Sequence, residues 1–269
     1  VWNRTAEKAR SLAGELGVQA PDALAELAAA VEAVVICVSA DSDVLEVVRA
    51  LAPGLAAGSL VIDCSTVAAD TARQAAELLG KQGVDFLDCP VSGGVEGARE
   101  GTLAVMAGGG SQAFERARPV LQAMGRTIAH FGPTGSGQAA KATNQIMCAG
   151  IIDTVSEAMA FARAQGLPLE KLIDNLGKGA GSSWYFIHRA PNMARGSYPP
   201  GFRVRLHAKD LAICRDMAAR FGVALPVVER MLSEYAELVS RGYGDEDISA
   251  TFRLKAELFE PSRGNAPSA

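Results

Sequence analysis

Short apolar runs alternate with amphipathic stretches through the first half of the chain. The runs are β-branched and bounded by Gly, Pro, Asp or Ser, which is typical of buried strands. They cover residues 34–38, 60–63, 84–88, 103–106 and 127–131. Helical patterns lie between them, at about residues 41–51, 68–82 and 111–124. Strand, helix and strand with short connections predict an α/β domain with a mainly parallel, doubly wound sheet over residues 1–133.

The pattern changes in the second half of the chain. Residues 138–164 contain no proline and are apolar on nearly every face, which predicts a buried helix at the centre of an all-helical domain. Further helices are expected at about residues 168–177, 207–221, 226–241 and 247–258, with C-caps at Gly166, Gly222 and Gly242. This all-α domain covers residues 134–260, and residues 261–269 form a Pro-, Ser- and Gly-rich tail that we expect to be frayed.

Composition excludes several classes of protein. The 269 residues are 49% hydrophobic and carry a net charge of −4, so no excess of basic residues is available to bind nucleic acid. No apolar run approaches the roughly 20 residues that span a bilayer. Five scattered cysteines without a CxxC pair suggest a reducing compartment, and three histidines without ligand spacing predict no metal site. We therefore expect a cytoplasmic protein without a membrane or nucleic-acid partner.

Polar residues follow the ends of several predicted strands. Ser39 follows the first strand, Thr66 follows the second, and the run from Asp88 to Gly94 follows the third. Open parallel sheets bind ligands at this edge. Within the run, Ser92-Gly93-Gly94 offers a hydroxyl and close backbone N–H groups that suit a carboxylate, although a tight turn alone would also require glycines.

Lys141 is the most informative single residue of the sequence. It lies near the start of the predicted buried helix, and Asn144 and Gln145 share its face at spacings of i+3 and i+4. A desolvated lysine has a lowered pKa and can exchange a proton with a substrate oxygen. The alternative is a lysine that stays solvated in the first turn of the helix.

Three motifs in order resemble the β-hydroxyacid dehydrogenase family, which includes 3-hydroxyisobutyrate dehydrogenase, tartronate semialdehyde reductase and the glyoxylate and succinic semialdehyde reductases. They are Asp88-Cys89-Pro90-Val91-Ser92-Gly93-Gly94, the run from Gly135 to Gln145, and Pro200-Gly201-Phe202 leading to Lys209-Asp210-Leu211. The resemblance covers about residues 1–258. It implies a Rossmann-like domain followed by an all-α domain like that of 6-phosphogluconate dehydrogenase.

The resemblance also implies roles for individual residues. Lys141 would be the catalytic general acid/base, Asn144 would bind substrate, and Ser92, Gly93 and Gly94 would hold the substrate carboxylate. The implied cofactor positions are Asn3, Arg4, Thr5, Val38, Ser39, Thr66 and Lys209. Family members are typically homodimers or homotetramers, with the helical domain building the interface.

Asn3-Arg4-Thr5 resembles the segment after the family's second strand, where the adenosine ribose is read. The guanidinium of Arg4 can bind a 2′-phosphate with two hydrogen bonds, so NADP is favoured over NAD. The alternative is that Arg4 is a solvated turn residue without a role in binding. The strand, GxGxxG-type loop and helix with which the family opens do not precede this segment. We expect the sequence to be an N-terminally shortened form of a family enzyme rather than a natural protein without cofactor binding.

Together, these features predict an NAD(P)-dependent oxidoreductase that interconverts a short 3-hydroxy acid and its semialdehyde or keto acid. An imine reductase-like enzyme is the alternative within this architecture, but such enzymes tend to lack a lysine at the position of Lys141. A non-catalytic dimeric module is the alternative from another class, because the Gly-rich loop is missing.

Overall fold

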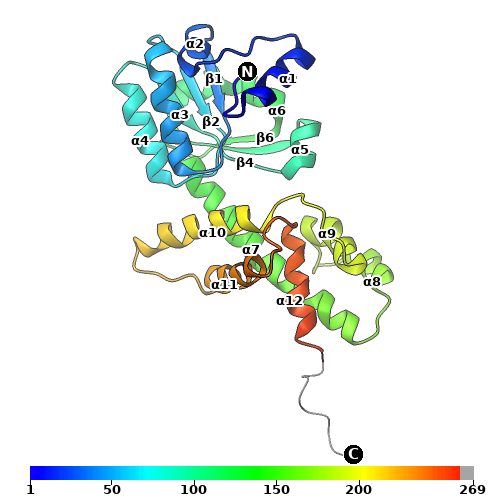
Figure 1. Cartoon of the computed structure of the whole chain (residues 1–269). Coiled ribbons are helices and arrows are strands. Elements are labelled where there is room, and N and C mark those ends of the chain that lie inside the picture. Colours follow the sequence, from blue (N-terminus) through cyan, green and yellow to red (C-terminus); the bar gives the residue numbers. More distant parts are fainter. Residues whose placement is uncertain (261–269) are drawn as a thin grey trace, which may run out of the picture. The chain divides into compact units, whose positions relative to one another are not determined.

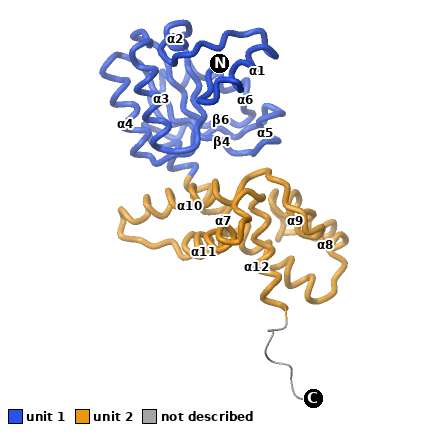
Figure 2. Tube along the Cα trace, viewed as in Figure 1, with its two compact units in different colours: residues 1–141 blue, residues 142–269 orange. Residues whose placement is uncertain are grey.

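The structure, a computed structural model, describes residues 1–260 (Figure 1). The chain divides into two compact units, residues 1–141 and residues 142 onward (Figure 2). The boundary predicted before residue 134 precedes helix α7 (Ser136–Ala164), whereas the compact units divide inside that helix. Residues 261–269, where the sequence predicts a frayed tail, lie outside the described residues.

Two three-stranded ladders build the sheet structure of unit 1. The first, in the order β1-β2-β3, is parallel and consists of β1 (Ala33–Ile36), β2 (Leu60–Asp63) and β3 (Asp85–Asp88). The second has the order β4-β5-β6 and consists of β4 (Val91–Ser92), β5 (Leu103–Ala107) and β6 (Gly125–His130). The five predicted strands and their mainly parallel pairing are confirmed. Strand β4, antiparallel to β5, was not predicted, because two residues are too short to show a period.

Helices precede and connect these strands. They are α1 (Ala6–Leu16), α2 (Leu24–Ala29), α3 (Asp41–Leu51), the 3₁₀ turn η1 (Ala52–Gly54), α4 (Ala69–Gly80), α5 (Gly94–Glu100) and α6 (Ser111–Met124). Helices α3, α4 and α6 match the sequence prediction. Helices α1, α2 and α5 were missed, although Gly17 ends α1 with φ of 66°, the left-handed C-cap that a glycine signals.

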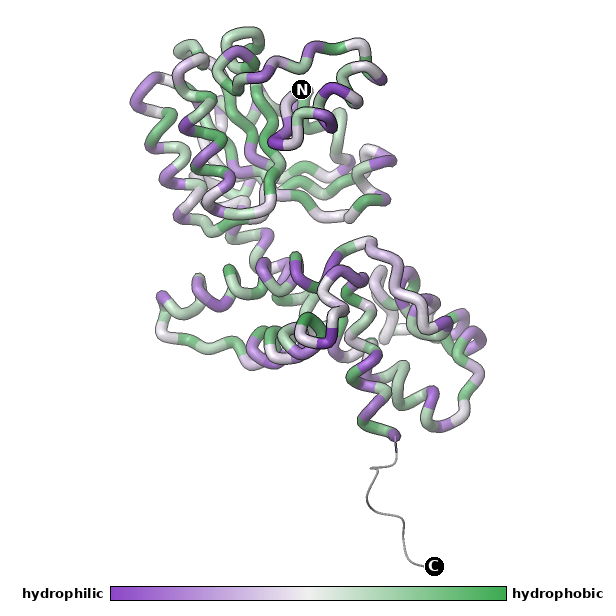
Figure 3. The backbone as a smooth tube through the Cα atoms, viewed as in Figure 1, coloured by the Kyte–Doolittle hydropathy of each residue, from purple (hydrophilic) through white to green (hydrophobic). Residues whose placement is uncertain are grey.

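The helices of unit 1 cover both faces of the parallel ladder. Side chains of α2, α3 and α4 pack on one face, where Val34, Val61 and Phe86 are buried. Helix α6 covers the other face, where Ile62 and Leu87 are buried. In Figure 3 these strands are mainly hydrophobic, whereas the helices alternate between hydrophobic and hydrophilic residues. The doubly wound α/β arrangement predicted from the sequence is therefore confirmed.

Unit 2 is entirely helical over its described residues. Besides α7 it contains α8 (Leu169–Leu176), α9 (Trp184–Arg195), α10 (Val204–Ala219), α11 (Pro226–Ser240), the 3₁₀ turn η2 (Ile248–Ala250) and α12 (Thr251–Glu257). Its core includes Met159, Met193, Leu211, Tyr235 and Phe252. Gly166, Gly222 and Gly242 have positive φ angles and follow the ends of α7, α10 and α11, but the C-cap residues of α10 and α11 are Arg220 and Arg241. Helix α9 was missed because its internal proline reads as a breaker.

Helix α7 differs from the prediction in one respect, because it is not buried on every face. Met147, Ile151 and Phe161 are 57%, 36% and 53% exposed, although Ile152 and Met159 on the same helix are buried in the core. The apolar positions of α7 therefore form a buried side and an exposed stripe, which periodicity alone does not separate.

Candidate active site

The ends of β1, β2 and β3 bring three polar loops to one edge of unit 1. Ile36 pairs with Asp63, and Asp63 pairs with Asp88, so the three strands end in register. The backbone N–H of Val38 donates to the Ser65 hydroxyl at 2.9 Å and joins the first two loops. The segments that follow these strands, with Ser39, Thr66 and, in β4, Ser92, therefore leave from the same sheet edge, as predicted.

The Ser92-Gly93-Gly94 segment forms a tight turn into α5. Ser92 is half-buried at the end of β4, and both glycines are exposed. Their φ angles of 133° and 65° favour glycine, and a Cβ on Gly93 would lie 3.1 Å from the Leu103 side chain. The turn therefore has a conformational reason for both glycines, which is compatible with ligand contact but does not require it.

Asp88 anchors the N-terminus of α7. Its carboxylate accepts hydrogen bonds from the backbone N–H groups of Gly135 at 2.8 Å and Gln138 at 2.9 Å. Burial raises the pKa of Asp88, and these hydrogen bonds partly offset the effect. The Gly-rich run that precedes α7 is thus engaged by an internal carboxylate. Sequence reasoning missed this role, although an acid at a strand end and a Gly-rich run before a helix are its signal.

Gln138 ties α7 to the loop that carries Thr66. Its side-chain Nε2 donates to the Ser65 carbonyl at 2.8 Å, and its Oε1 accepts from the Val67 N–H at 3.1 Å. Thr66 lies between these two anchored residues and is half-buried. One buried amide therefore fixes the loop and the first turn of α7 together.

Lys141 follows Gln138 by one turn of α7 and is only 7% exposed. The expected burial of this lysine is confirmed, and the solvated alternative is wrong. A lysine is seldom buried, because removing its charge from water costs free energy unless another group compensates. A buried titratable side chain is therefore a candidate for a functional site, and Lys141 is our candidate for proton transfer.

A chain of side-chain contacts runs from α7 to α10 within unit 2. Asn144 Nδ2 donates to Gln145 Oε1, and Gln145 Nε2 donates to Asp210 Oδ2, both at 2.8 Å. Asp210 Oδ1 lies 2.9 Å from Lys209 Nζ. Sequence reasoning placed Asp210 in a motif with Lys209 but gave it no role, and its contact with Gln145 across the two helices was not predicted.

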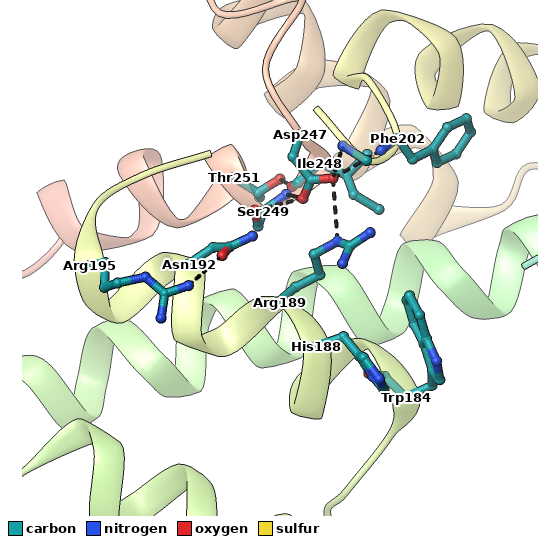
Figure 4. A network of polar contacts seen from close by, with 11 residues as sticks. Trp184, His188, Arg189, Asn192, Arg195, Phe202, Asp247, Ile248, Ser249 and Thr251 are labelled. Atoms are coloured by element: carbon teal, nitrogen blue, oxygen red, sulfur yellow. Dashed lines mark hydrogen bonds and ion pairs between the residues drawn. The ribbon is translucent and has the colours of Figure 1, made fainter. Parts of the chain in front are cut away.

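The Pro200-Gly201-Phe202 motif is held by a buried carboxylate (Figure 4). Asp247 Oδ2 accepts from the N–H groups of Gly201 at 3.2 Å and Phe202 at 3.0 Å, and lies 3.4 Å from Arg189 Nε. A Cβ on Gly201 would lie 2.4 Å from Arg189 Nη2, so a larger residue here would displace the end of the Arg189 side chain. This network sets where α10, with Lys209 and Asp210, begins.

The Asn3-Arg4-Thr5 segment precedes α1 and carries no strand. Asn3 Oδ1 accepts from the Thr5 N–H at 2.9 Å, which makes a local turn. Arg4 Nη2 lies 2.7 Å from Asp43 Oδ1 and 3.5 Å from Glu46 Oε2 on α3. A phosphate bound by Arg4 would therefore have to displace or share these two carboxylates, although 65% of the arginine side chain is exposed.

Comparison with known proteins agrees with this architecture. Residues 1–132 match the NAD-binding domain of 6-phosphogluconate dehydrogenase, and residues 135–255 match the NAD-binding domain of NADP-dependent 3-hydroxyisobutyrate dehydrogenase. The chain belongs to the 3-hydroxyisobutyrate dehydrogenase (β-hydroxyacid dehydrogenase) family. The family resemblance and fold class predicted from the sequence are confirmed.

Relatives of this 3-hydroxyisobutyrate dehydrogenase family member include proteins named as dehydrogenases of small hydroxy acids. An NAD-dependent L-serine dehydrogenase of Pseudomonas aeruginosa is 37% identical over 78% of this chain and 72% of its own length. An L-threonate dehydrogenase of Escherichia coli is 34% identical over 93% of this chain and 83% of its own length. A solved 3-hydroxyisobutyrate dehydrogenase of Mycobacterium tuberculosis with L-serine is 31% identical, with a TM-score of 0.85 over 94% of this chain and 89% of that chain.

The chain is thus an enzyme of the NAD(P)-dependent 3-hydroxyacid dehydrogenase family. The family matches identify its NAD(P)-binding domain, and its homologues use either NAD or NADP. Helix α7 is the single helix among residues 1–260 that is long and apolar enough to cross a bilayer, which the expectation from apolar runs overlooked. Half of that apolar window is buried inside the protein.

Proposed function

We propose that the enzyme interconverts a short 3-hydroxy acid and the corresponding semialdehyde or keto acid. The observation that carries this proposal is the buried Lys141 on α7, one turn before Asn144. Relatives named for serine and threonate support small hydroxy acids as the substrate class.

In the proposed reaction, Lys141 acts on the reacting hydroxyl. Its neutral amine takes the hydroxyl proton during oxidation, and its ammonium returns a proton to the carbonyl oxygen during reduction. Asn144 orients the reacting oxygen through its amide. Ser92, with the backbone of Gly93 and Gly94, binds the substrate carboxylate. When bound, the nicotinamide supplies the two-electron acceptor that takes hydride from the carbinol carbon and returns it in reduction.

The residues of unit 1 fit a dinucleotide at the sheet edge. Asp43 accepts hydrogen bonds from the backbone N–H groups of Ser39 and Ala40 and also pairs with Arg4, so the two proposed cofactor segments are joined. Val38 is joined to the loop of Thr66 through Ser65. We assign cofactor contact to Asn3, Arg4, Thr5, Val38, Ser39, Thr66 and Lys209, with NADP favoured over NAD.

The exposed stripe of α7 supports a homodimer or homotetramer. Met147, Ile151 and Phe161 present apolar surface on the helix that forms the centre of unit 2. Association of two copies through this stripe would remove that surface from water. All five cysteines are free thiols, which supports the cytoplasm as the location.

Replacement of Lys141 tests the proposed chemistry. Lys141→Ala should lower kcat by about 10²–10⁴-fold, because general acid–base catalysis by a positioned group contributes about that much. Lys141→Arg should be similarly inactive, since a guanidinium keeps the charge but does not release its proton near neutral pH. Affinity for NADPH and NADH should stay within about twofold in both variants, as measured by fluorescence titration.

Lys171→Ala is the matched control, because Lys171 is an exposed lysine on α8. It should retain wild-type kcat. Activity of Lys141→Ala near the wild-type level would refute the proposed role of Lys141. An equal loss of activity, cofactor affinity and thermal stability would make Lys141 a structural residue instead.

A further inference from the structure

Arg4 lies among negative charges that oppose its proposed role as the reader of a 2′-phosphate. Its guanidinium Nη2 lies 2.7 Å from Asp43 and 3.5 Å from Glu46. Asp43 is the third residue and Glu46 the sixth of the run that forms α3 (Asp41–Leu51), so both carboxylates come from one helix. The local sum of these three side chains is one positive and two negative charges.

Asp43 is the better fixed of the two carboxylates. Only 19% of its side chain is exposed, compared with 72% for Glu46. It also accepts hydrogen bonds from the backbone N–H groups of Ser39 and Ala40, and the hydrogen bond from Arg4 lowers its pKa. Asp43 is therefore ionised at neutral pH and is held between the two segments that we assign to the cofactor.

The 2′-phosphate of NADP carries about −1.5 to −2 charges at neutral pH, and NAD lacks this group. To use Arg4, the phosphate must displace Asp43 from the guanidinium or share it, and must approach a second carboxylate. The uncharged 2′-hydroxyl of NAD neither has to compete with Asp43 for Arg4 nor is repelled by the second carboxylate. Arg4 and Asp43 therefore act on the choice of cofactor in opposite directions.

We infer that Asp43 is a cofactor-selecting residue that reduces the advantage of NADP over NAD by competing for Arg4. The inference rests on the proposed assignment of Arg4 and Ser39 to the cofactor. Glu46 contributes in the same direction and more weakly, because it is farther from Arg4 and more exposed.

The test measures dissociation constants for NADPH and NADH with wild-type protein, Asp43→Asn and Glu46→Gln. Asparagine keeps the oxygen that accepts from Ser39 and Ala40 and removes the charge. Exposed ion pairs are typically worth a factor of about 1.5–5 in an equilibrium. We expect Asp43→Asn to raise affinity for NADPH relative to NADH by about two- to fivefold, and Glu46→Gln to raise it by less than Asp43→Asn.

Two controls separate selection from general charge. Asp85→Asn removes one negative charge from the start of β3, where Asp85 pairs with Arg116 rather than Arg4, and should leave the ratio unchanged. In an Arg4→Gln background, Asp43→Asn should change the ratio by less than it does in the wild type, because the competition is gone.

Each outcome decides the inference. A ratio in Asp43→Asn equal to that of wild type, with both cofactors bound, overturns the selecting role and leaves the proposed function intact. An equal rise in Asp85→Asn also overturns it, because the effect would then be one of net charge. No binding of either cofactor to any variant or to wild type refutes the cofactor assignment and the inference together.

Discussion

Asp63 and Asp88 end neighbouring strands at paired positions, and both side chains are fully buried. Asp88 is engaged by the N-terminus of α7, whereas Asp63 Oδ1 accepts only from the Ser65 N–H among the hydrogen bonds described, and its Oδ2 has no partner within residues 1–260. Burial raises the pKa of Asp63 to about 7, with a smaller contribution from the charge of Asp88. The free energy of folding should therefore depend on the protonation of this carboxyl.

The folded protein should lose stability as pH rises through the pKa of Asp63. In the unfolded chain the pKa of the same carboxyl is about 3.9, so the folded state keeps the proton up to a higher pH than the unfolded state does. The contribution of Asp63 to the free energy of unfolding is fully present below about pH 4 and is lost by about pH 8. It amounts to at most about 4 kcal/mol. Urea unfolding between pH 5 and 8 measures it.

Asp63→Asn keeps the shape of the neutral carboxyl and should flatten this pH dependence. Asp85→Asn, which removes an exposed carboxylate at the other end of a neighbouring strand, should leave the slope as in the wild type. The same slope in Asp63→Asn as in the wild type would show that other groups control stability in this range.

At the scale of elements, buried carboxylates fix where functional helices begin. Asp88 holds the start of α7, and Asp247 holds the loop that enters α10. Each accepts backbone N–H groups that a turn or helix end leaves without internal partners. The helices that carry Lys141 and Lys209 are thus anchored by carboxylates that are distant from them in sequence.

Asp247→Ala should destabilise unit 2 by about 3–5 kcal/mol, because it leaves the Arg189 charge buried without its partner carboxylate. It also removes the acceptor for Gly201 and Phe202. Trp184 lies beside Arg189, so its fluorescence in a Trp2→Phe background reports unfolding of this unit.

Asn192→Ala is the control for this change, because Asn192 bonds the exposed Arg195 at the edge of the same network (Figure 4). The free energy of unfolding should fall by about 1 kcal/mol or less. A loss below about 1 kcal/mol in Asp247→Ala as well would contradict the anchoring role.

At the scale of the whole molecule, the exposed side of α7 is the feature that one chain leaves unexplained. Its apolar residues repeat at helical spacing from Met147 through Ile151 to Phe161. The proposed self-association would bury this stripe, and the central helix of each copy would then have apolar neighbours on both sides.

The double substitution Met147→Glu and Ile151→Glu should convert the proposed oligomer to a monomer, because it places like charges in an apolar interface. Sedimentation velocity measures the mass. Phe221→Glu changes another exposed apolar residue of unit 2 and should leave the mass unchanged. An unaltered oligomer in the double variant, or a monomeric wild type, would contradict the assignment of this stripe.

Local pattern in the sequence determines most of the strands and long helices. Residues 41–51 and 111–124 were predicted as the helices α3 and α6, because apolar periodicity and clear boundaries coincide there. Helices α1, α2, α5 and α9 were not predicted, because they are short or their apolar periodicity is weak or interrupted by proline. The motifs at Ser92, Lys141 and Lys209 were also visible, because their residue types are unusual for their local context.

By itself, then, the sequence determined the two-domain α/β and all-α organisation, the family and the burial of Lys141. Only the tertiary structure decided which groups act on these residues: the contact of Asp43 with Arg4, of Asp210 with Gln145, and of Asp247 with Phe202. Each joins segments at least 39 residues apart. Periodicity and spacing report neighbours along one element, whereas charge pairing and desolvation depend on which distant side chains folding brings within a few ångströms.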